Sequence, residues 1–265
     1  MTQRTSHYPR LDYDPLAGQF DQRYRANPLS GVEQTLVDLS QTLGSERILE
    51  VGCGTGRWLK GLAARDSKCQ LYGLDASQGM LKIARNGTHP LQLLQGRAGQ
   101  LPFTTQSFGL IFCVNALHHF AEPDSFIQQT QQILKPGGVL AVIGQVPQDR
   151  RNRWYVYDFF AGTYEQDLRR FPTWGVVTEW MIAAGFEQIH WQPVEQISGD
   201  KIGQAVLDDP FLQKKAVSQL ALLSEEAYAA GIAKIKQAIR QAEANQEIIK
   251  FETQLRLDLL TGTRP

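Results

Sequence analysis

One stretch of the chain decides its fold: Ile48-Leu49-Glu50-Val51-Gly52-Cys53-Gly54-Thr55-Gly56. Its first half is apolar, and together with Arg47 it predicts a buried parallel strand over residues 47–51. Glycine occupies alternate positions in the second half, so the backbone can bend sharply and a ligand can approach it without meeting a β-carbon. A helix is predicted next from apolar residues at helical spacing, Trp58, Leu59 and Leu62.

A second apolar run, residues 69–75, ends in Asp75 and predicts the neighbouring strand. A carboxylate at this position can accept hydrogen bonds from both hydroxyls of a ribose. The dinucleotide fingerprint G-x-G-x-x-G would need glycine at position 57, where the chain has Arg57. The spacing therefore indicates a nucleoside-binding βαβ unit and argues against NAD.

The pattern G-x-G-x-G after the acidic Glu50 resembles motif I of the class I S-adenosylmethionine (SAM) dependent methyltransferases. Four further stretches resemble this family, in the family's order: residues 75–81, 96–103, 108–120 and 133–140. The resemblance covers roughly residues 45–195. It implies an α/β, Rossmann-like fold, with a seven-stranded, mostly parallel sheet, an antiparallel last strand and helices on both faces.

The resemblance also implies SAM as the cofactor, with no metal. The residues that it assigns to cofactor binding are Glu50, Gly52, Gly54, Gly56, Asp75, Ala76, Met80, Arg97, Ala98 and Asn115.

Two positions depart from the family's pattern. Arg97 stands where the family commonly has an acid that accepts from the adenine amino group, and an arginine can only donate. The Arg97 side chain is expected either against the purine face or beside a carboxylate such as Glu122 or Asp124. In both cases the backbone N–H of Ala98 can still donate a hydrogen bond to the adenine. Gly109 replaces a mainly structural Asp, for which we expect a local consequence only.

His118, His119 and Asn115 follow the fourth predicted strand, at the edge where an open α/β sheet binds its ligand. A hydroxyl, acid or carbon acceptor of a methyl group needs a proton removed, so His118 and His119 are candidate catalytic bases. An imidazole of ordinary pKa predicts a rate that falls between about pH 8 and 5. The alternative is structural: one ring packs beneath a helix over residues 124–134 and the other binds a carbonyl.

The sequence predicts four regions: a lid or helical segment (1–44), the SAM-binding core (45–198), a helical insertion that is a candidate substrate cap (199–246) and the final strand of the sheet (247–265). The lid contains a helix over 31–43 and aromatic residues that either line the acceptor pocket or pack in the core. In the insertion, Ser224 is the predicted cap of a long helix. Alternating residues over 248–260 predict the final strand.

Residues 150–160 are basic and then strongly aromatic. They indicate either an aromatic acceptor wall with an anion-binding arginine or an amphipathic helix with a solvated basic end, and the helix is the favoured interpretation. A helix over 178–185, stopped by Gly185, and a strand over 188–194 follow.

The composition of the chain limits the classes of partner and the cellular location that are expected. The chain has 27 basic and 27 acidic residues, so no nucleic-acid partner is expected. Cys53, Cys69 and Cys113 form no C-x-x-C pair and are expected to be reduced, packed thiols of a cytoplasmic protein. Residues 1–8 lack a signal-peptide core, and no apolar stretch approaches the roughly 20 residues that membrane insertion needs. The oligomeric state is left open.

These features predict a SAM-dependent methyltransferase whose partner is a small-molecule methyl acceptor, a small or medium-sized metabolite. Two alternatives remain at this stage: a noncatalytic protein that binds SAM or S-adenosylhomocysteine, and a SAM-dependent methylene transfer to a lipid chain. Amino methylation of nucleic-acid bases is disfavoured because no Asn-Pro-Pro-Tyr or Asp-Pro-Pro-Tyr run follows the fourth strand. Cys113 has no neighbouring proline, unlike a cysteine that attacks cytosine.

Overall fold

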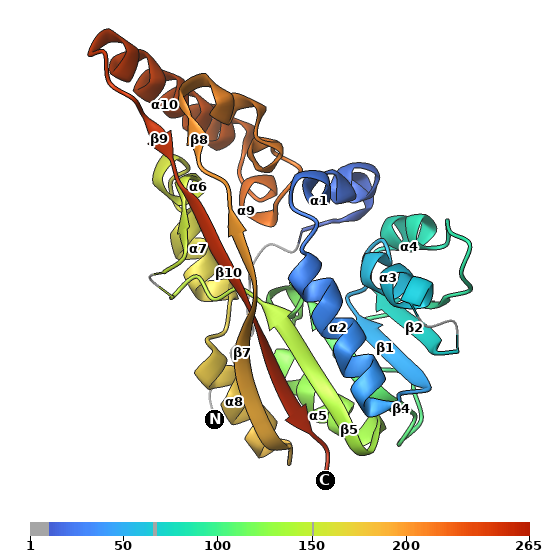
Figure 1. The fold of residues 1–265 in the computed structure, drawn as a ribbon. Coiled ribbons are helices and arrows are strands. Elements are labelled where there is room, and N and C mark those ends of the chain that lie inside the picture. The colour runs from blue at the N-terminus through green and yellow to red at the C-terminus, as the bar shows by residue number, and fades with distance from the viewer. Residues whose placement is uncertain (1–10, 66–67, 150) are drawn as a thin grey trace.

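The computed structural model describes residues 11–65, 68–149 and 151–265 (Figure 1). The prediction for residues 1–8 therefore lies outside the described residues, as does Arg150. Within those ranges, no helix combines the length and the apolar character needed to cross a membrane.

A mixed sheet forms the centre of the molecule, and its order is β3-β2-β1-β4-β5-β10-β6, with β7 also paired to β10. The strands are β1 (Arg47–Val51), β2 (Gln70–Asp75), β3 (Gln92–Gln95), β4 (Phe108–Val114), β5 (Leu134–Gly144), β6 (Arg153–Trp154), β7 (Glu187–Ser198) and β10 (Thr253–Thr263). The pairs from β3 to β5 are parallel, whereas β10 runs antiparallel to β5, β6 and β7. The predicted mostly parallel sheet with an antiparallel last strand is confirmed. The described residues add an eighth strand, the two-residue β6.

Helices cover both faces of the sheet, as predicted. On one face α2 (Ser30–Leu43) and α3 (Arg57–Arg65) pack over Ile48 and Phe112. On the other, α5 (Pro123–Ile133) and α8 (Trp174–Ala183) pack over Leu49 and Ile111. Successive side chains of β1 and β4 point to opposite faces, and both faces are covered by apolar clusters, which explains why both strands are rich in apolar residues.

The helical insertion stands on two long strands. Figure 1 shows β7 and β10 running side by side from the core to the base of the insertion, and their pairing extends, with two register shifts, from Glu187 opposite Thr263 to Ser198 opposite Gln254. The insertion contains β8 (Lys201–Ile202), the 3-10 turns η3 (Gly203–Asp208) and η4 (Pro210–Leu212), α9 (Ser218–Ala221), α10 (Glu225–Ala244) and β9 (Lys250–Phe251). Ser224 caps α10 by accepting a hydrogen bond from Ala227 N at 3.1 Å.

Two segments differ from the sequence prediction. Arg151 and Arg153 are not in a helix: only α6 (Tyr155–Phe159) is helical, because Trp154 pairs with Thr253 as β6 and its side chain is buried. The final strand begins at Thr253 and continues to Thr263, five residues later at its start than predicted, because Phe251 pairs with Lys201 in a separate two-stranded sheet.

The insertion packs tightly against α6, and a glycine makes this possible. A β-carbon on Gly231 of α10 would lie 2.2 Å from Phe160 Cδ1. Gly231→Ala is therefore expected to lower the free energy of unfolding by about 1–3 kcal/mol through overpacking. Gly175→Ala on α8 is the control: its nearest neighbour would lie at 3.8 Å, and it should stabilise by about 0.4–1 kcal/mol. Denaturant unfolding of both variants measures the difference, and equal stabilities would contradict this packing.

Candidate functional site

The glycine-rich turn lies at the carboxyl end of β1 and is tied to β2. Gly52, Gly54 and Gly56 have φ angles of 75°, 52° and 71°, which L side chains rarely adopt. Gly52 N donates to Leu74 O at 2.7 Å. A β-carbon on Gly52 would lie 2.7 Å from Ala116 Cβ, and one on Gly56 would lie 3.2 Å from Ala84 Cβ. The positive φ angles thus require all three glycines, and close approach to neighbouring segments adds to this at Gly52 and Gly56.

Asp75 ends β2 beside this turn. Its Oδ2 accepts from Gly54 N at 2.7 Å, and its Oδ1 accepts from Ser77 N at 2.8 Å. Burial raises the pKa of the Asp75 carboxyl, while these backbone N–H groups act in the opposite direction. Each carboxylate oxygen can accept a second hydrogen bond, so Asp75 keeps the capacity to bind two hydroxyls.

Glu50 lies beneath the turn and is 1% exposed. Its Oε2 has no hydrogen-bond partner among the described residues. Burial, and next the charge of Asp75, raise the pKa of the Glu50 carboxyl well above its ordinary value. A buried acceptor without a donor is costly, so this oxygen is suited to a cationic or N–H group of a ligand.

The other residues assigned to the cofactor surround the same edge of the sheet. Ala76 is exposed and Met80 is buried, at the start of α4 (Gln78–Ala84), whose N-cap Ser77 accepts from Met80 N. Ala98 is buried. Asn115, at a φ of 48°, follows β4 and donates through its N–H to Ile143 O at 2.8 Å.

Arg97 is exposed, and in the described part of the chain it forms no ion pair, so the alternative in which it pairs with Glu122 or Asp124 is not observed. Gly109 has a local explanation: a β-carbon there would lie 2.7 Å from Ser45 Oγ.

The two histidines form the short turn η2 (Leu117–His119) after β4, and each has a partner that sequence reasoning missed. The Tyr13 hydroxyl lies 2.8 Å from His119 Nε2, 106 residues away in the chain. The His118 ring stacks on Phe171, with centroids 3.7 Å apart and an interplanar angle of 15°. His119 thus lies beside a phenol and His118 beside an aromatic ring, and the choice between the catalytic and the structural interpretation stays a prediction.

Both imidazoles are held neutral. Burial lowers the pKa of His119 to about 3, and the cations Arg170 and Arg23 act in the same direction. Burial, then His119 and the two arginines, lower the pKa of His118 well below its ordinary value. A neutral imidazole with its proton on Nδ1 accepts a hydrogen bond from the phenol through Nε2. A fall in rate caused by protonation of His119 is thus expected below pH 5 rather than between 8 and 5.

The same shifts predict acid sensitivity of the fold. The unfolded chain protonates a histidine near pH 6.5, whereas the folded protein keeps His119 neutral down to about pH 3. Stability is therefore full above about pH 6.5 and is lost as the pH falls, by about 1.4 kcal/mol per pH unit for each such histidine. Denaturant unfolding from pH 7 to 5 should show a smaller loss for His119→Gln than for the unsubstituted protein. Parallel pH dependences of the two proteins would refute the shifted pKa.

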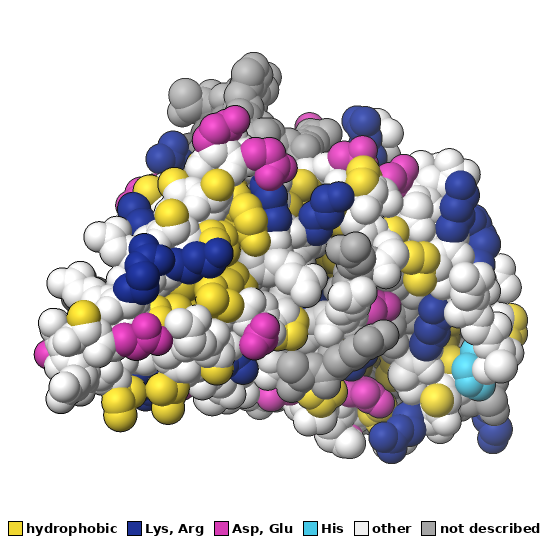
Figure 2. Space-filling model, turned by 90° about the horizontal axis from the view of Figure 1, so that it is seen from above, with side chains coloured by type: hydrophobic (Ala, Val, Ile, Leu, Met, Phe, Trp, Pro, Cys, Tyr) yellow, Lys and Arg dark blue, Asp and Glu magenta, His cyan; other side chains and the backbone are white. Residues whose placement is uncertain are grey.

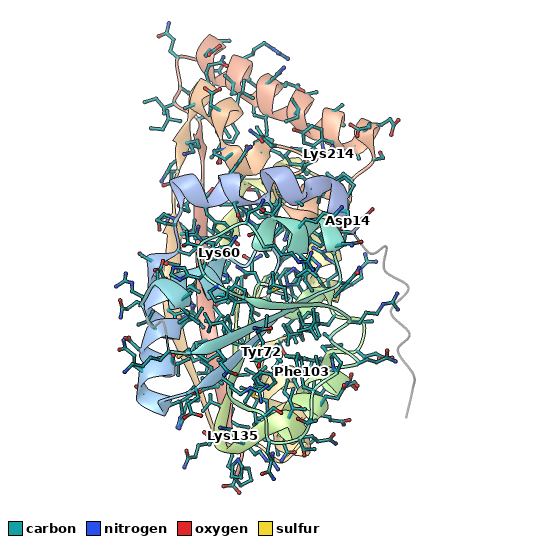
Figure 3. All side chains as sticks on the ribbon, turned by 90° about the vertical axis from the view of Figure 1, so that its right-hand side faces the viewer. Asp14, Lys60, Tyr72, Phe103, Lys135 and Lys214 are labelled. Carbon is teal, nitrogen blue, oxygen red and sulfur yellow. The ribbon has the colours of Figure 1, made fainter. Side chains whose placement is uncertain are left out.

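The N-terminal 3-10 helix η1 (Asp14–Gln22) lies across this edge of the sheet. Asp14 Oδ1 accepts from Gly79 N at 2.9 Å, and Figure 3 shows Asp14 where the N-terminal segment meets α4. Asp21 Oδ1 accepts from Thr55 Oγ1 at 2.9 Å, beside the glycine-rich turn. Phe20 packs edge-to-face on Tyr13, with centroids 5.8 Å apart. The segment thus contacts both the turn and the histidines.

A small pocket of ≈ 20 Å³ opens at the ends of β4 and β5, which is room for about one water molecule. Asn115, His118, Gly144, Phe171 and Trp174 are among the residues that line it. The two histidines are half-buried, and Tyr13 of the N-terminal segment contacts His119.

Comparisons with known proteins find methyltransferases that are similar to this chain. A family model described as a methyltransferase domain matches residues 49–142. A demethylmenaquinone methyltransferase of Geobacillus stearothermophilus is 29% identical over 173 residues, 56% of this chain and 74% of the relative. A phthiotriol/phenolphthiotriol dimycocerosates methyltransferase of Mycobacterium leprae (strain TN) is 30% identical over 130 residues, 48% of each chain.

The fold is also similar to that of a solved methyltransferase structure. The solved structure of Haemonchus contortus phosphoethanolamine N-methyltransferase 2 in complex with SAM superimposes with a TM-score of 0.58. It is 17% identical, and the match covers 99% of this chain and 58% of that one. The glycine-rich turn, the carboxylates of Glu50 and Asp75 and these relatives lead to one conclusion. Residues 49–142 match a methyltransferase domain, and the chain is a SAM-dependent methyltransferase whose cofactor is SAM.

Proposed function

We propose that this enzyme transfers the methyl group of SAM to a small or medium-sized metabolite that binds between the histidine turn and the N-terminal segment. The hydrogen bond between Tyr13 and His119 carries the proposal. It places a phenol and a neutral imidazole at the carboxyl end of β4, the edge at which α/β sheets bind their ligands. Proton-accepting chemistry thus adjoins the cofactor-binding turn.

The surroundings of this pair favour a small acceptor over a polymer. Tyr13, the residue before η1, packs on His119 and on Phe20 of η1, and Phe171 stacks on His118 from the segment before α8. Figure 2 views the molecule from the insertion end and shows basic and acidic side chains interspersed rather than separated into one basic surface. The relatives named for demethylmenaquinone and phthiotriol support an acceptor of this size class.

The chain's own residues have separable tasks in this proposal. Asp75 binds the ribose hydroxyls, and Glu50 offers its unpartnered Oε2 to the amino group of the cofactor's methionine part. SAM, when bound, supplies an electrophilic methyl group on a sulfonium. A hydroxyl or carbon acceptor gives its proton to the Tyr13 oxygen while the phenol passes its own proton to Nε2 of His119, which becomes an imidazolium.

A turnover assay tests the proposal. The purified protein is incubated with SAM and fractionated metabolite extracts, and formation of S-adenosylhomocysteine is measured, with the Asp75→Ala protein as the control. We expect S-adenosylhomocysteine to form in fractions that contain small molecules, and we expect the Asp75→Ala protein to lose this activity. Saturable binding of SAM without turnover in any fraction would instead favour the noncatalytic SAM-binding protein. Turnover only with nucleic acid or protein would contradict a metabolite acceptor.

A further inference from the structure

Two arginines approach the Tyr13–His119 pair from different elements, and nothing assigned so far uses them. Arg23, at the start of α1 (Arg23–Ala26), donates from Nη1 to Ala216 O at 3.2 Å. Arg170, at the end of α7 (Thr163–Arg170), donates from Nη2 to Ser218 Oγ at 3.1 Å. Both guanidinium groups therefore reach the same short segment of the insertion, two residues apart.

The neighbours of these arginines place them beside the histidine turn. Arg170 precedes Phe171, the ring that stacks on His118. The Arg23 guanidinium lies 3.7 Å over the ring of Phe20, which packs on Tyr13. Arg170 thus lies next to the ring that contacts His118, and Arg23 lies next to the ring that contacts Tyr13. Consistent with this placement, both cations contribute to lowering the pKa of each histidine.

Each arginine keeps an unused donor. Among the described residues, Arg23 Nε and Arg170 Nε are buried and have no hydrogen-bond partner. The Arg170 side chain is only 5% exposed. Buried N–H donors without an acceptor destabilise a structure, and an acceptor group placed between these two would satisfy both.

The charge of the cluster is not balanced. Asp167 Oδ1 pairs with Arg170 at 2.6 Å, while its Oδ2 accepts from Tyr157 and Gln219. Arg23 has no acidic partner within 4.0 Å among the described residues. Arg23, Arg170 and Asp167 together carry an excess of one positive charge, which favours an anion beside the half-buried Arg23. Asp75 is the acid that acts on Tyr13 from the cofactor side.

We propose that Arg23 and Arg170 form a binding site for an anionic oxygen group, a carboxylate or phosphate, of the methyl acceptor. The site deepens the proposed function and rests on it, because it fixes the chemical class of the acceptor. Binding of the anion satisfies the two Nε donors and neutralises the excess charge. It also makes His119 a stronger base, since a nearby anion raises the pKa of an imidazole.

The same anionic chemistry has a second source, the carboxylate of the cofactor's methionine part, and the experiment separates the two. S-adenosylhomocysteine carries that carboxylate, so the protein is first saturated with it. Inorganic phosphate is then titrated into the complex by calorimetry. The variants are Arg23→Gln and the double variant Asp167→Asn/Arg170→Gln, which removes the ion pair as a unit. Arg169→Gln, an exposed arginine next to Arg170, is the matched control.

We expect saturable phosphate binding to the complex, weakened at least about 10-fold in both variants and unchanged in the control, because each arginine supplies charge-assisted hydrogen bonds. Affinity for S-adenosylhomocysteine should change less than about 3-fold, as expected when an anion outside the cofactor is the ligand. Absence of saturable phosphate binding to the unsubstituted complex would overturn the proposal, as would a 10-fold loss of S-adenosylhomocysteine affinity in Arg23→Gln.

Melting temperatures identify a variant that fails to fold. Should the double variant unfold, Arg23→Gln decides alone, because that arginine has no ion pair to lose. None of these measurements uses turnover. A protein that binds phosphate through the two arginines and methylates nothing would therefore refute the proposed function and leave the anion site intact.

Discussion

His119→Ala is expected to lower kcat by about 10²–10⁴-fold while leaving SAM affinity unchanged, because removal of a proton belongs to the transition state and not to cofactor binding. Tyr13→Phe should also lower kcat, since it deletes the hydroxyl that lies 2.8 Å from His119 Nε2. His118→Ala serves as the comparison. Its ring stacks on Phe171, so this variant should lose stability more than rate.

Steady-state kinetics with the acceptor found in the turnover assay, together with calorimetry for SAM, measures these effects. The rate of the unsubstituted enzyme should not fall through protonation of His119 above pH 5, given a pKa of about 3. If the His119→Ala and His118→Ala enzymes both keep nearly full activity, His119 is not the base. Catalysis then rests on alignment alone, as suits a thiol or amine that is deprotonated when it binds.

Asp75→Ala is expected to weaken both SAM and S-adenosylhomocysteine by about 10–100-fold. The substitution removes a shared acceptor for two ribose hydroxyls, a loss of about 1.5–3 kcal/mol for charge-assisted hydrogen bonds. It also releases Gly54 N, which holds the glycine-rich turn against β2. Asp75→Asn keeps one acceptor oxygen, so its affinity for both ligands should lie between that of Asp75→Ala and that of the unsubstituted protein.

Calorimetry with both ligands measures the loss. Asp38→Ala is the matched control, because Asp38 is an exposed acid on α2 whose side chain accepts only from Gln34 Nε2. NAD should show no saturable binding to the unsubstituted protein at millimolar concentration. Unchanged affinity in Asp75→Ala would reject this carboxylate as the ribose ligand, and tight NAD binding would reject the spacing argument at Arg57.

Much of the fold was determined by local sequence. Ile48, Leu49 and Val51 are apolar because β1 is covered on both faces, so the strand is evident without the rest of the molecule. The alternate glycines after it mark positive φ angles that the backbone needs at this turn. The helix caps Ser224 and Gly185 were also recognisable, because capping depends on residues within one turn of each other.

Local pattern failed where pairing between distant segments decided the structure. The aromatic run after Arg153 reads as one amphipathic helix, but Trp154 pairs with Thr253 and shortens that helix to five residues. The final strand starts late because Phe251 pairs with Lys201 in another sheet. Such pairings depend on which chain segments meet, and periodicity within a segment carries no information on its partner.

The same division applies to the site. The sequence by itself determined the cofactor, because a strand, a glycine turn and Asp75 form one contiguous unit whose spacing reflects a nucleoside. Only the tertiary structure brought Tyr13 to His119, Phe171 to His118, and Arg23 and Arg170 to one segment of the insertion. Burial keeps both imidazoles neutral, so the fall in rate that protonation of His119 would cause moves from between pH 8 and 5 to below pH 5. An enclosed site acquires its charge and its pKa values from groups far apart in the chain, and these are set only when the chain has folded.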